Sequence, residues 1–194
     1  MADSSGNHHD GLYQAAAVLS QPGAIPHDPS AAVLFGGNAG ATVPASTTLA
    51  FTSVTIELWL KKRSDQSYGV VAAQSDCATR HACFDLLNHA GTGQLELRIV
   101  SDANPVLVST KRLEAGTWYH VVATYDGAIA SLYINGTLDS SGPAPASQLS
   151  SVGPWSIGRR ADGFFSDAVI DEVALYPVAL SADQVSAHWH AAGN

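Results

Sequence analysis

Residues Gly116 to Thr137 read Gly-Thr-Trp-Tyr-His-Val-Val-Ala-Thr-Tyr-Asp-Gly-Ala-Ile-Ala-Ser-Leu-Tyr-Ile-Asn-Gly-Thr, and this stretch decides the fold. The run from Trp118 to Tyr125 is rich in aromatic and β-branched residues, which favour strands. Asp126-Gly127 and Asn135-Gly136 are tight-turn signals, because Gly, Asp and Asn tolerate the left-handed backbone region. Ala128 to Ile134 alternates as a return strand between them. The stretch therefore predicts an antiparallel meander of three strands on two tight turns.

The rest of the chain is predicted to add further strands to this meander. Short apolar or alternating runs are separated by turn residues, which is typical of antiparallel sheets. Between residues 54 and 60, Glu57 and Trp59 face away from four aliphatic residues, so the outer side of this strand is expected to be partly covered or to line a concave surface. The additional strands are expected at 12–18, 31–35, 54–60, 68–73, 84–87, 94–100, 106–110, 154–158 and 164–176.

Three other segments have a different character. Residues 140–151 are rich in Ser, Pro and Ala and predict a long loop. Lys61-Lys62-Arg63 is a single basic cluster, expected at a solvated strand end. Ser181 is expected to cap a short helix over 181–190, with Asp183 and Gln184 in its first turn. With 194 residues, the chain fits one all-β domain over 1–194.

Charge excludes two classes of partner. The chain has 9 Lys and Arg against 17 Asp and Glu, a net charge of −8. Nucleic-acid binding needs clustered Lys and Arg, and so does adhesion to anionic membranes. No apolar run is long enough to span a bilayer, so no membrane insertion is expected. The polar start at Met1 has no signal-peptide pattern, which predicts that the domain belongs to a longer secreted protein or reaches the outside another way.

The two cysteines, Cys77 and Cys83, bracket a short polar segment. A local disulfide between them is the favoured interpretation, and it would indicate an oxidising compartment. Two free thiols or a metal pair are the alternatives. A structural zinc site would need two more Cys or His ligands at matching spacing, and only His81 lies close.

The opening stretch resembles the central hairpin of laminin-G-like domains of the concanavalin A-like jelly-roll superfamily, where the pattern W-x-H-V/L-A/V-x-T/V-Y/F-D-G recurs. Residues 54–60 resemble the family's F-T-V/I-E-A/L-W-V/L-K strand, and residues 170–185 resemble its closing strand and helix, in the same order. The resemblance implies a two-sheet antiparallel jelly-roll sandwich with a short C-terminal helix. The polar loop over 1–11 resembles the family's opening segment, so a preceding strand is expected to be absent or supplied by another part of a parent protein.

The resemblance also implies a structural calcium ion at the rim of the sandwich. The matching positions are Asp3 and Asn7 in the opening loop, and Asp171 beside Glu172 in the closing strand. Gly36 stands where many relatives carry Asp, which counts against the site. The alternative is that Asp171 caps turn amides while Glu172 pairs with an arginine such as Arg159.

Catalytic patterns are missing from the sequence. Glucanases of the superfamily carry two carboxylates at E-x-D-x-x-E spacing, and no such spacing occurs here. The eight histidines lack the i, i+4 zinc pattern, and there is no G-x-S-x-G elbow or phosphate-binding glycine loop. The chain is therefore predicted not to be an enzyme.

Loops and aromatic residues remain as candidate ligand contacts, because aromatic ring faces stack on sugars. Besides Tyr68 and Phe165, which share this aromatic character, the predicted ligand-binding residues are Asp76, Arg80, His81, Trp155, Arg159 and Phe164. For each aromatic residue among them, packing in the core is the alternative. The predicted function is that of an extracellular carbohydrate- or cell-surface-binding module, working beside neighbouring domains of a larger bacterial or phage protein. A spacer domain that makes protein contacts is the rival, and a polysaccharide hydrolase or lyase is the weaker alternative.

Overall fold

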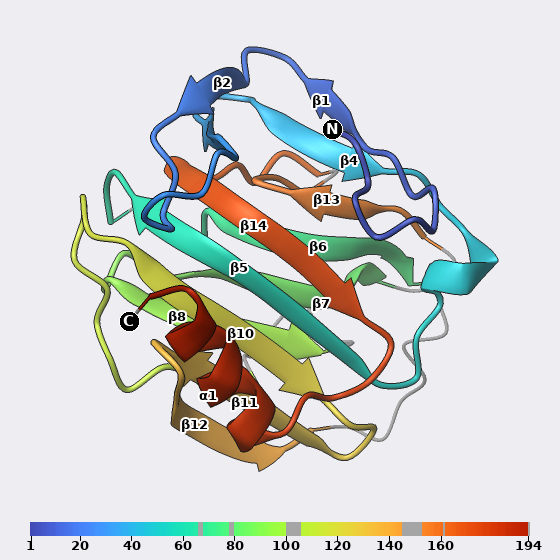
Figure 1. Ribbon diagram of the computed structural model, residues 1–194. Helices are drawn as coiled ribbons and strands as arrows, with labels where there is room; N and C mark the ends of the chain where they lie inside the picture. The colour runs from blue at the N-terminus through green and yellow to red at the C-terminus, as the bar shows by residue number, and fades with distance from the viewer. Residues whose placement is uncertain (66–67, 78–79, 100–105, 145–152, 161, 194) are drawn as a thin grey trace.

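Two seven-stranded antiparallel sheets pack face to face, which confirms the predicted all-β jelly-roll sandwich (Figure 1). The computed structural model describes residues 1–65, 68–77, 80–99, 106–144, 153–160 and 162–193, and for 75–77 and 80–83 it describes the backbone alone. The first sheet, called the β7 sheet, contains β1 (Leu12–Gln14), β4 (Gly40–Val43), β13 (Trp155–Ile157), β6 (Val70–Cys77), β7 (Arg80–His89), β8 (Gln94–Ile99) and β9 (Leu107–Val108) in spatial order. The second, called the β10 sheet, contains β12 (Thr137–Pro143), β11 (Ile129–Ile134), β10 (Tyr119–Tyr125), β5 (Val54–Lys62), β14 (Ala168–Tyr176), β3 (Ala32–Phe35) and β2 (Val18–Gln21).

The predicted meander is confirmed as β10, β11 and β12, which are neighbours at one side of the β10 sheet. Asn135 and Gly136 both have positive φ, 53° and 75°, as a tight turn between twisted strands requires. A side chain at Gly136 would also collide with Trp189, whose Cβ lies 2.7 Å from an ideal Cβ position. This turn therefore needs glycine for its conformation and for the close approach of the C-terminal helix.

The core lies between the sheets and follows the two-residue period of the strands. On β5, Val54, Ile56, Leu58 and Leu60 are all 0% exposed and belong to the main core cluster, as the alternation predicts. Removal of such apolar surface from water is the main stabilising term of the sandwich.

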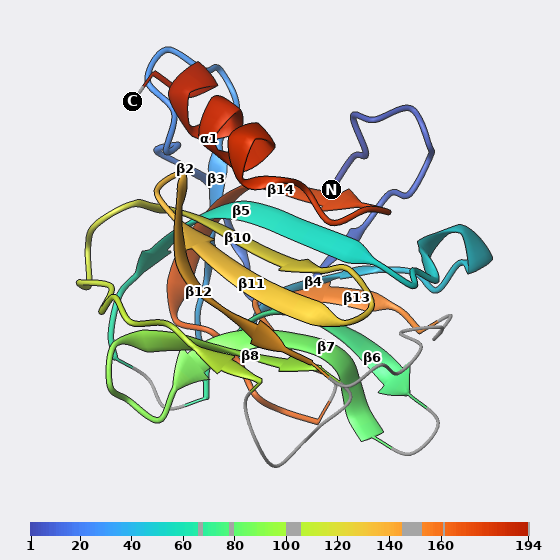
Figure 2. The same ribbon diagram turned by 90° about the horizontal axis from the view of Figure 1, so that it is seen from below.

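The described residues form one α-helix, α1 (Ala182–Ala191), and one short 3-10 helix, η1 (Thr47–Leu49). The helix α1 lies on the outer side of the β10 sheet, and Figure 2 shows it above the two layers of strands. Ser181 caps the helix as predicted, and Gln184 completes a capping box by accepting from the Ser181 amide. Within the described residues, no helix is long and apolar enough to cross a membrane.

Some predicted elements were wrong in extent. The expected strand over 12–18 is split into β1 and β2, because Ala15 has a positive φ of 54° and the chain passes from one sheet to the other. β4 was not expected, since its sequence is short and lacks a large apolar residue besides Val43. β12 extends to Pro143, inside the segment predicted as a loop. β6 and β7 continue to Cys77 and from Arg80, so strands occupy most of the segment predicted as a polar loop.

Candidate functional site

The outer face of the β7 sheet carries buried charged residues. Phe84 and Leu86 of β7 point into the core, so Asp85 and Leu87 point to the opposite face. Register places Asp85 opposite Arg98 and Leu87 opposite Glu96 on β8. Asp85, Leu87 and Glu96 are each 1% exposed despite their outward direction. The loop between β13 and β14 covers this face, as the ion pair from Arg160 to Asp85 shows.

A hollow of about 130 Å³ opens on this face and is named here the aromatic hollow. Tyr68 and Phe164 are 38% and 40% exposed, and both rings line it. The Arg98 guanidinium lies 5.4 Å from the Tyr68 ring centre, and that of Arg160 lies 4.7 Å from the Phe164 ring centre. Cation–π contacts of this kind fix each ring on one side and leave part of its surface exposed. The lining residues are Tyr68, Leu87, Arg98, Arg160 and Phe164.

Both arginines of the aromatic hollow form ion pairs with carboxylates. Arg160 pairs with the buried Asp85, and its Nε and Nη2 donate to Asp162 at 2.8 and 2.9 Å. Arg98 pairs with Glu96, which also contacts His89. Burial raises the pKa of Asp85 to about 6, although the positive charge of Arg160 opposes this shift. The two arginines that line the hollow are therefore fixed by ion pairs with carboxylates that do not line it.

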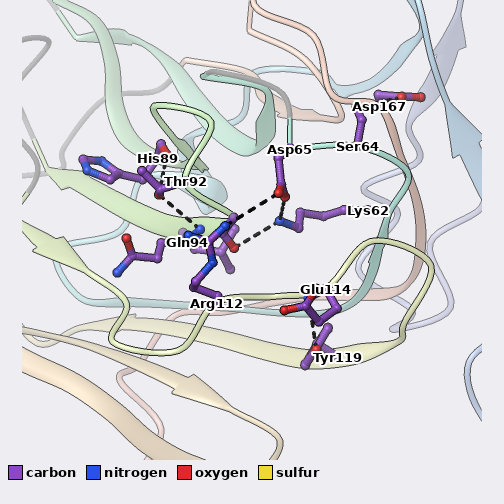
Figure 3. Close-up of polar contacts among 12 residues, drawn as sticks. Lys62, Ser64, Asp65, His89, Thr92, Gln94, Arg112, Glu114, Tyr119 and Asp167 are labelled. Carbon is purple, nitrogen blue, oxygen red and sulfur yellow. Dashed lines mark hydrogen bonds and ion pairs between the residues drawn. The ribbon is translucent and has the colours of Figure 1, made fainter.

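The loop that carries Tyr68 is anchored at both ends. Lys62 is only 1% exposed, and its Nζ donates to Asp65 at 2.8 Å and to the Gly93 carbonyl at 3.0 Å. Figure 3 shows Lys62 and Arg112 approaching the Asp65 carboxylate from two directions. At the other end, the Tyr68 amide donates to Asn88 of β7 at 3.1 Å. The prediction of a solvated basic cluster was wrong for Lys62, whose charge is buried because it has two acceptors.

The loop that carries Phe164 is a tight reversal between β13 and β14. The Arg160 amide donates to the Phe164 carbonyl at 2.8 Å, and Ser166 donates to the Gly158 carbonyl at 2.8 Å. Gly163 has a φ of 99°, a conformation that other residues rarely adopt. These bonds present Phe164 on a backbone of fixed shape.

The structure brings together some of the predicted ligand residues and separates others. Phe164 and Tyr68 meet at one hollow, although they are far apart in the sequence. Arg159 lies outside it, where it donates to Gln14 at 2.5 Å and covers the Phe165 ring. Trp155 was wrong as a sugar-stacking residue: it is 0% exposed and packs between Phe51 and Phe84 in the core. The side chains of the remaining predicted residues, Asp76, Arg80, His81, Cys77 and Cys83, lie outside the described part of the chain, so their roles stay predictions.

The residues predicted for calcium have hydrogen-bond partners within the chain, which are backbone amides for two of them and serine hydroxyls for the other two. Asp3 accepts from Ser5 and His9 at 2.8 Å each, and Asp171 accepts from Ala24 at 2.8 Å. Among the described residues, no group of three or more His, Cys, Asp or Glu side chains is arranged to hold a metal ion. The calcium ion stays a prediction. Of the two other predicted positions, Asn7 donates to Ser5, and Glu172 accepts from Ser30 rather than from the expected Arg159.

A second polar cluster lies beneath α1, on the outer face of the β10 sheet. Glu57 is 7% exposed and accepts from His120 at 2.7 Å and from His188 of the helix at 2.9 Å. Trp189 stacks on Trp59 with ring centres 5.3 Å apart. Burial alone would raise the pKa of Glu57, but the hydrogen bonds and charges of the two histidines outweigh it and lower the pKa below its usual value. These contacts attach α1 to the sheet, and the His188 side chain stays 40% exposed.

Replacing Glu57 with glutamine is expected to lower the free energy of unfolding by ~1–3 kcal/mol at pH 7, because charged acceptors stabilise buried donors most strongly. The folded-state pKa of Glu57 lies below the ordinary value of 4.5. Ionised Glu57 therefore stabilises the fold above that value, and the contribution is lost as the pH falls through the folded-state pKa. Urea unfolding between pH 7 and pH 3 should show that the difference in unfolding free energy between E57Q and the unmodified protein shrinks as the pH falls. E172Q, with the same charge change at an exposed acid, should behave as the unmodified protein; an equal deficit at pH 3 would contradict the role of Glu57.

Comparison with known proteins identifies the family of this fold. A family model described as the concanavalin A-like lectin/glucanases superfamily matches residues 35–186. No curated protein sequence matches the chain. Domain 4 of AbnA, an extracellular GH43 arabinanase from Geobacillus stearothermophilus solved with arabinotriose, has a TM-score of 0.79 and 19% identity over 96% of this chain and 91% of that one.

Two further solved structures share the fold over part of their length. The binding domain of botulinum neurotoxin DC, in complex with rat synaptotagmin II, has a TM-score of 0.72 and 12% identity over 98% of this chain and 48% of its own. A Trypanosoma rangeli sialidase in complex with a difluoro-KDN compound has a TM-score of 0.65 and 15% identity over 81% of this chain and 27% of its own. At such identities the likeness concerns the fold alone.

Proposed function

The chain belongs to the concanavalin A-like lectin/glucanases superfamily, and from this membership and the aromatic hollow we propose that it is a non-catalytic module that recognises glycans on extracellular surfaces. One observation carries the proposal: Tyr68 and Phe164, both partly exposed, stand at a single hollow between two fixed guanidinium groups. Aromatic rings offer rigid apolar faces to the carbon faces of sugar rings. The arabinotriose bound to the AbnA domain supports a glycan as the ligand class.

The charged groups beneath the hollow support recognition rather than cleavage. A glycosidase needs two carboxyl groups that flank the scissile bond and reach the substrate. Asp85 and Glu96 are each 1% exposed, are paired with Arg160 and Arg98, and do not line the hollow. A substrate in the hollow would meet the arginines and aromatic rings instead.

A spacer role that uses protein contacts is the second candidate, and one observation favours it. Leu12, Val18 and Leu19 are 66%, 48% and 49% exposed on β1 and β2, which form the edges of the two sheets at one side of the sandwich. Exposed apolar residues at sheet edges suit contact with a neighbouring domain. In this case substitutions at the aromatic hollow would leave the activity of the larger protein unchanged.

Phe164→Ala and Tyr68→Ala are each expected to weaken glycan affinity by about 10- to 100-fold, or ~1.4–2.7 kcal/mol, because each removes one of the two partly exposed stacking faces. A glycan array, read with and without EDTA, would first identify a ligand, and titration calorimetry would then measure each variant. Tyr13→Ala is the matched control, since Tyr13 is 36% exposed on β1 and does not line the hollow. An absence of binding to every glycan and cell-wall preparation would overturn the proposal. A loss of glycan binding that occurs only in the presence of EDTA would support the predicted calcium ion.

A further inference from the structure

The aromatic hollow has an apolar floor. Leu87 lines it and is only 1% exposed, so this side chain lies at the bottom. Leu87 forms a small buried cluster with Val70 and Ala73, separate from the main core, and register places Val70 opposite it. The rings of Tyr68 and Phe164 line the hollow as well, and its exposed surface is almost entirely apolar. A group that enters therefore gains most if it is apolar itself, because it moves from water to a carbon surface.

The backbone holds Tyr68 beside this floor in a strained conformation. Tyr68 has a φ of 56°, in the left-handed region that a bulky residue rarely adopts. The Tyr68 amide donates to the Asn88 carbonyl at 3.1 Å, and the Asn88 amide donates to the Gly69 carbonyl at 3.0 Å, which fixes this backbone to β7. Strain of this kind persists where the surroundings enforce it, and it clusters at binding and catalytic sites. The position of the Tyr68 ring is therefore a built feature of the hollow.

The size of the hollow suits a substituent rather than a whole sugar ring. Its volume of about 130 Å³ equals that of about four water molecules at ~30 Å³ each. An acetamido group has a comparable number of non-hydrogen atoms: nitrogen, carbonyl carbon, oxygen and methyl carbon. The lone methyl carbon of a deoxysugar would leave most of the space without contacts, and unfilled space loses dispersion attraction. A hydroxyl group is equally small and would bring a polar group to an apolar floor.

We infer that the aromatic hollow takes the acetamido group of an N-acetylated amino sugar, with its methyl against Leu87 and its amide beside the rings of Tyr68 and Phe164. The polar amide atoms can stay hydrated at the mouth, because the hollow opens on the outer face of the sheet. The inference rests on the proposed glycan-binding function and adds the chemical class of the ligand. Discrimination comes from the apolar floor, and the exposed faces of the two rings remain for the sugar ring itself.

Sugars that differ only at C2 provide the test. Chitotriose and cellotriose carry an acetamido and a hydroxyl group there on the same β-1,4-linked backbone, and the methyl β-glycosides of N-acetylgalactosamine and galactose form a second pair. Calorimetry at pH 7 should show the acetamido member of a pair binding about tenfold more tightly, the effect of a methyl and part of an amide leaving water. Ligand NMR should show that the acetyl methyl receives the largest saturation transfer from the protein and that its signal shifts upfield beside the ring faces.

Variants of the floor test where the acetamido group binds. Leu87→Ala removes the surface that the methyl contacts and should narrow the difference within a pair severalfold. Leu87→Met keeps the volume and the apolar character of the floor and should preserve the difference. Leu138→Ala removes the same atoms from a leucine of β12 that is 55% exposed and does not line the hollow, so it should leave the difference unchanged. If Leu87→Ala does not fold, the sugar comparison and the NMR signals of the unmodified protein decide the question.

The outcomes separate the inference from the function on which it rests. Equal binding within each pair, or tighter binding of the hydroxyl members, would overturn the acetamido inference while glycan recognition stands. An array ligand without any acetamido group, together with no binding of the two N-acetylated sugars, would overturn it as well. A preference for the acetamido members that Leu87→Ala leaves intact would place acetamido recognition away from this hollow. Binding of no sugar in these pairs or on the array would overturn the glycan-binding function itself.

Discussion

Replacing Arg160 with methionine is expected to lower the free energy of unfolding by ~3–5 kcal/mol at pH 7.5, because it leaves the buried Asp85 carboxylate without its cation. Arg160 is 5% exposed and Asp85 is 1% exposed, so water cannot replace the lost partner. Methionine retains most of the side-chain length, and the effect therefore reports on charge more than on packing. Urea unfolding followed by circular dichroism measures the change, with the midpoint and slope compared between variants.

The pH dependence of Arg160→Met is part of this prediction. The folded-state pKa of Asp85 is about 6, above its ordinary value of 3.8, so the folded protein binds this proton more tightly than the unfolded chain. Stability therefore falls as the pH rises between these two values. Without Arg160 the folded-state pKa should rise further, so the deficit should be larger at pH 8 than at pH 5.

Two companion variants test the cause of the expected deficit. Arg159→Met removes a neighbouring arginine whose guanidinium contacts the neutral Gln14 and should cost less than ~1 kcal/mol. The double variant Arg160→Met, Asp85→Leu replaces the whole pair by apolar side chains and should recover most of the loss. If Arg160→Met were as stable as Arg159→Met at pH 8, Asp85 would not be held ionised by Arg160.

Local patterns predicted the scaffold because the strands of this fold are defined by short-range rules. The alternation around Glu57 and Trp59 predicted a strand with one face in the core and an outer face that is either partly covered or part of a concave surface, and α1 covers it. The Asn135-Gly136 turn and the Ser181 cap were also visible in the sequence, since each depends on residues a few positions apart.

The candidate site was only partly predictable because it depends on residues distant in sequence. Phe164 and Tyr68 could be named as aromatic candidates, but nothing in the sequence indicated that they meet. Arg98 and Arg160 were missed as lining residues, since their roles follow from the pairing of β7 with β8 and from the path of the loop after β13. Leu87 in Phe-Asp-Leu-Leu, an apolar residue on the same face of the strand as Asp85, was the available signal for a covered outer face. Trp155 was misplaced because a loop-flanked tryptophan has the same local sequence whether it points outward or inward.

Replacing Trp155 with alanine is expected to lower the free energy of unfolding by ~3–5 kcal/mol, because truncation of a fully buried aromatic leaves a cavity that the surroundings fill only in part. Trp155 is 0% exposed, and its ring centre lies 6.3 Å from that of Phe51 and 5.8 Å from that of Phe84. Domains of this kind are stabilised by only ~5–15 kcal/mol, so the loss should shift the urea midpoint markedly. Trp118→Ala is the matched control: this tryptophan is half-buried beneath Lys61 at the surface and should cost far less.

Stability and affinity together distinguish the two roles that an aromatic residue can have in this domain. Trp155→Ala should lose stability and, under conditions where it remains folded, keep its glycan Kd within about twofold, because the residue does not line the aromatic hollow. Phe164→Ala should show the reverse, with weakened binding and a stability change below ~1 kcal/mol, since its ring is 40% exposed. If Trp155→Ala instead lost glycan affinity at unchanged stability, Trp155 would belong to the ligand site. The ligand would then bind away from the aromatic hollow.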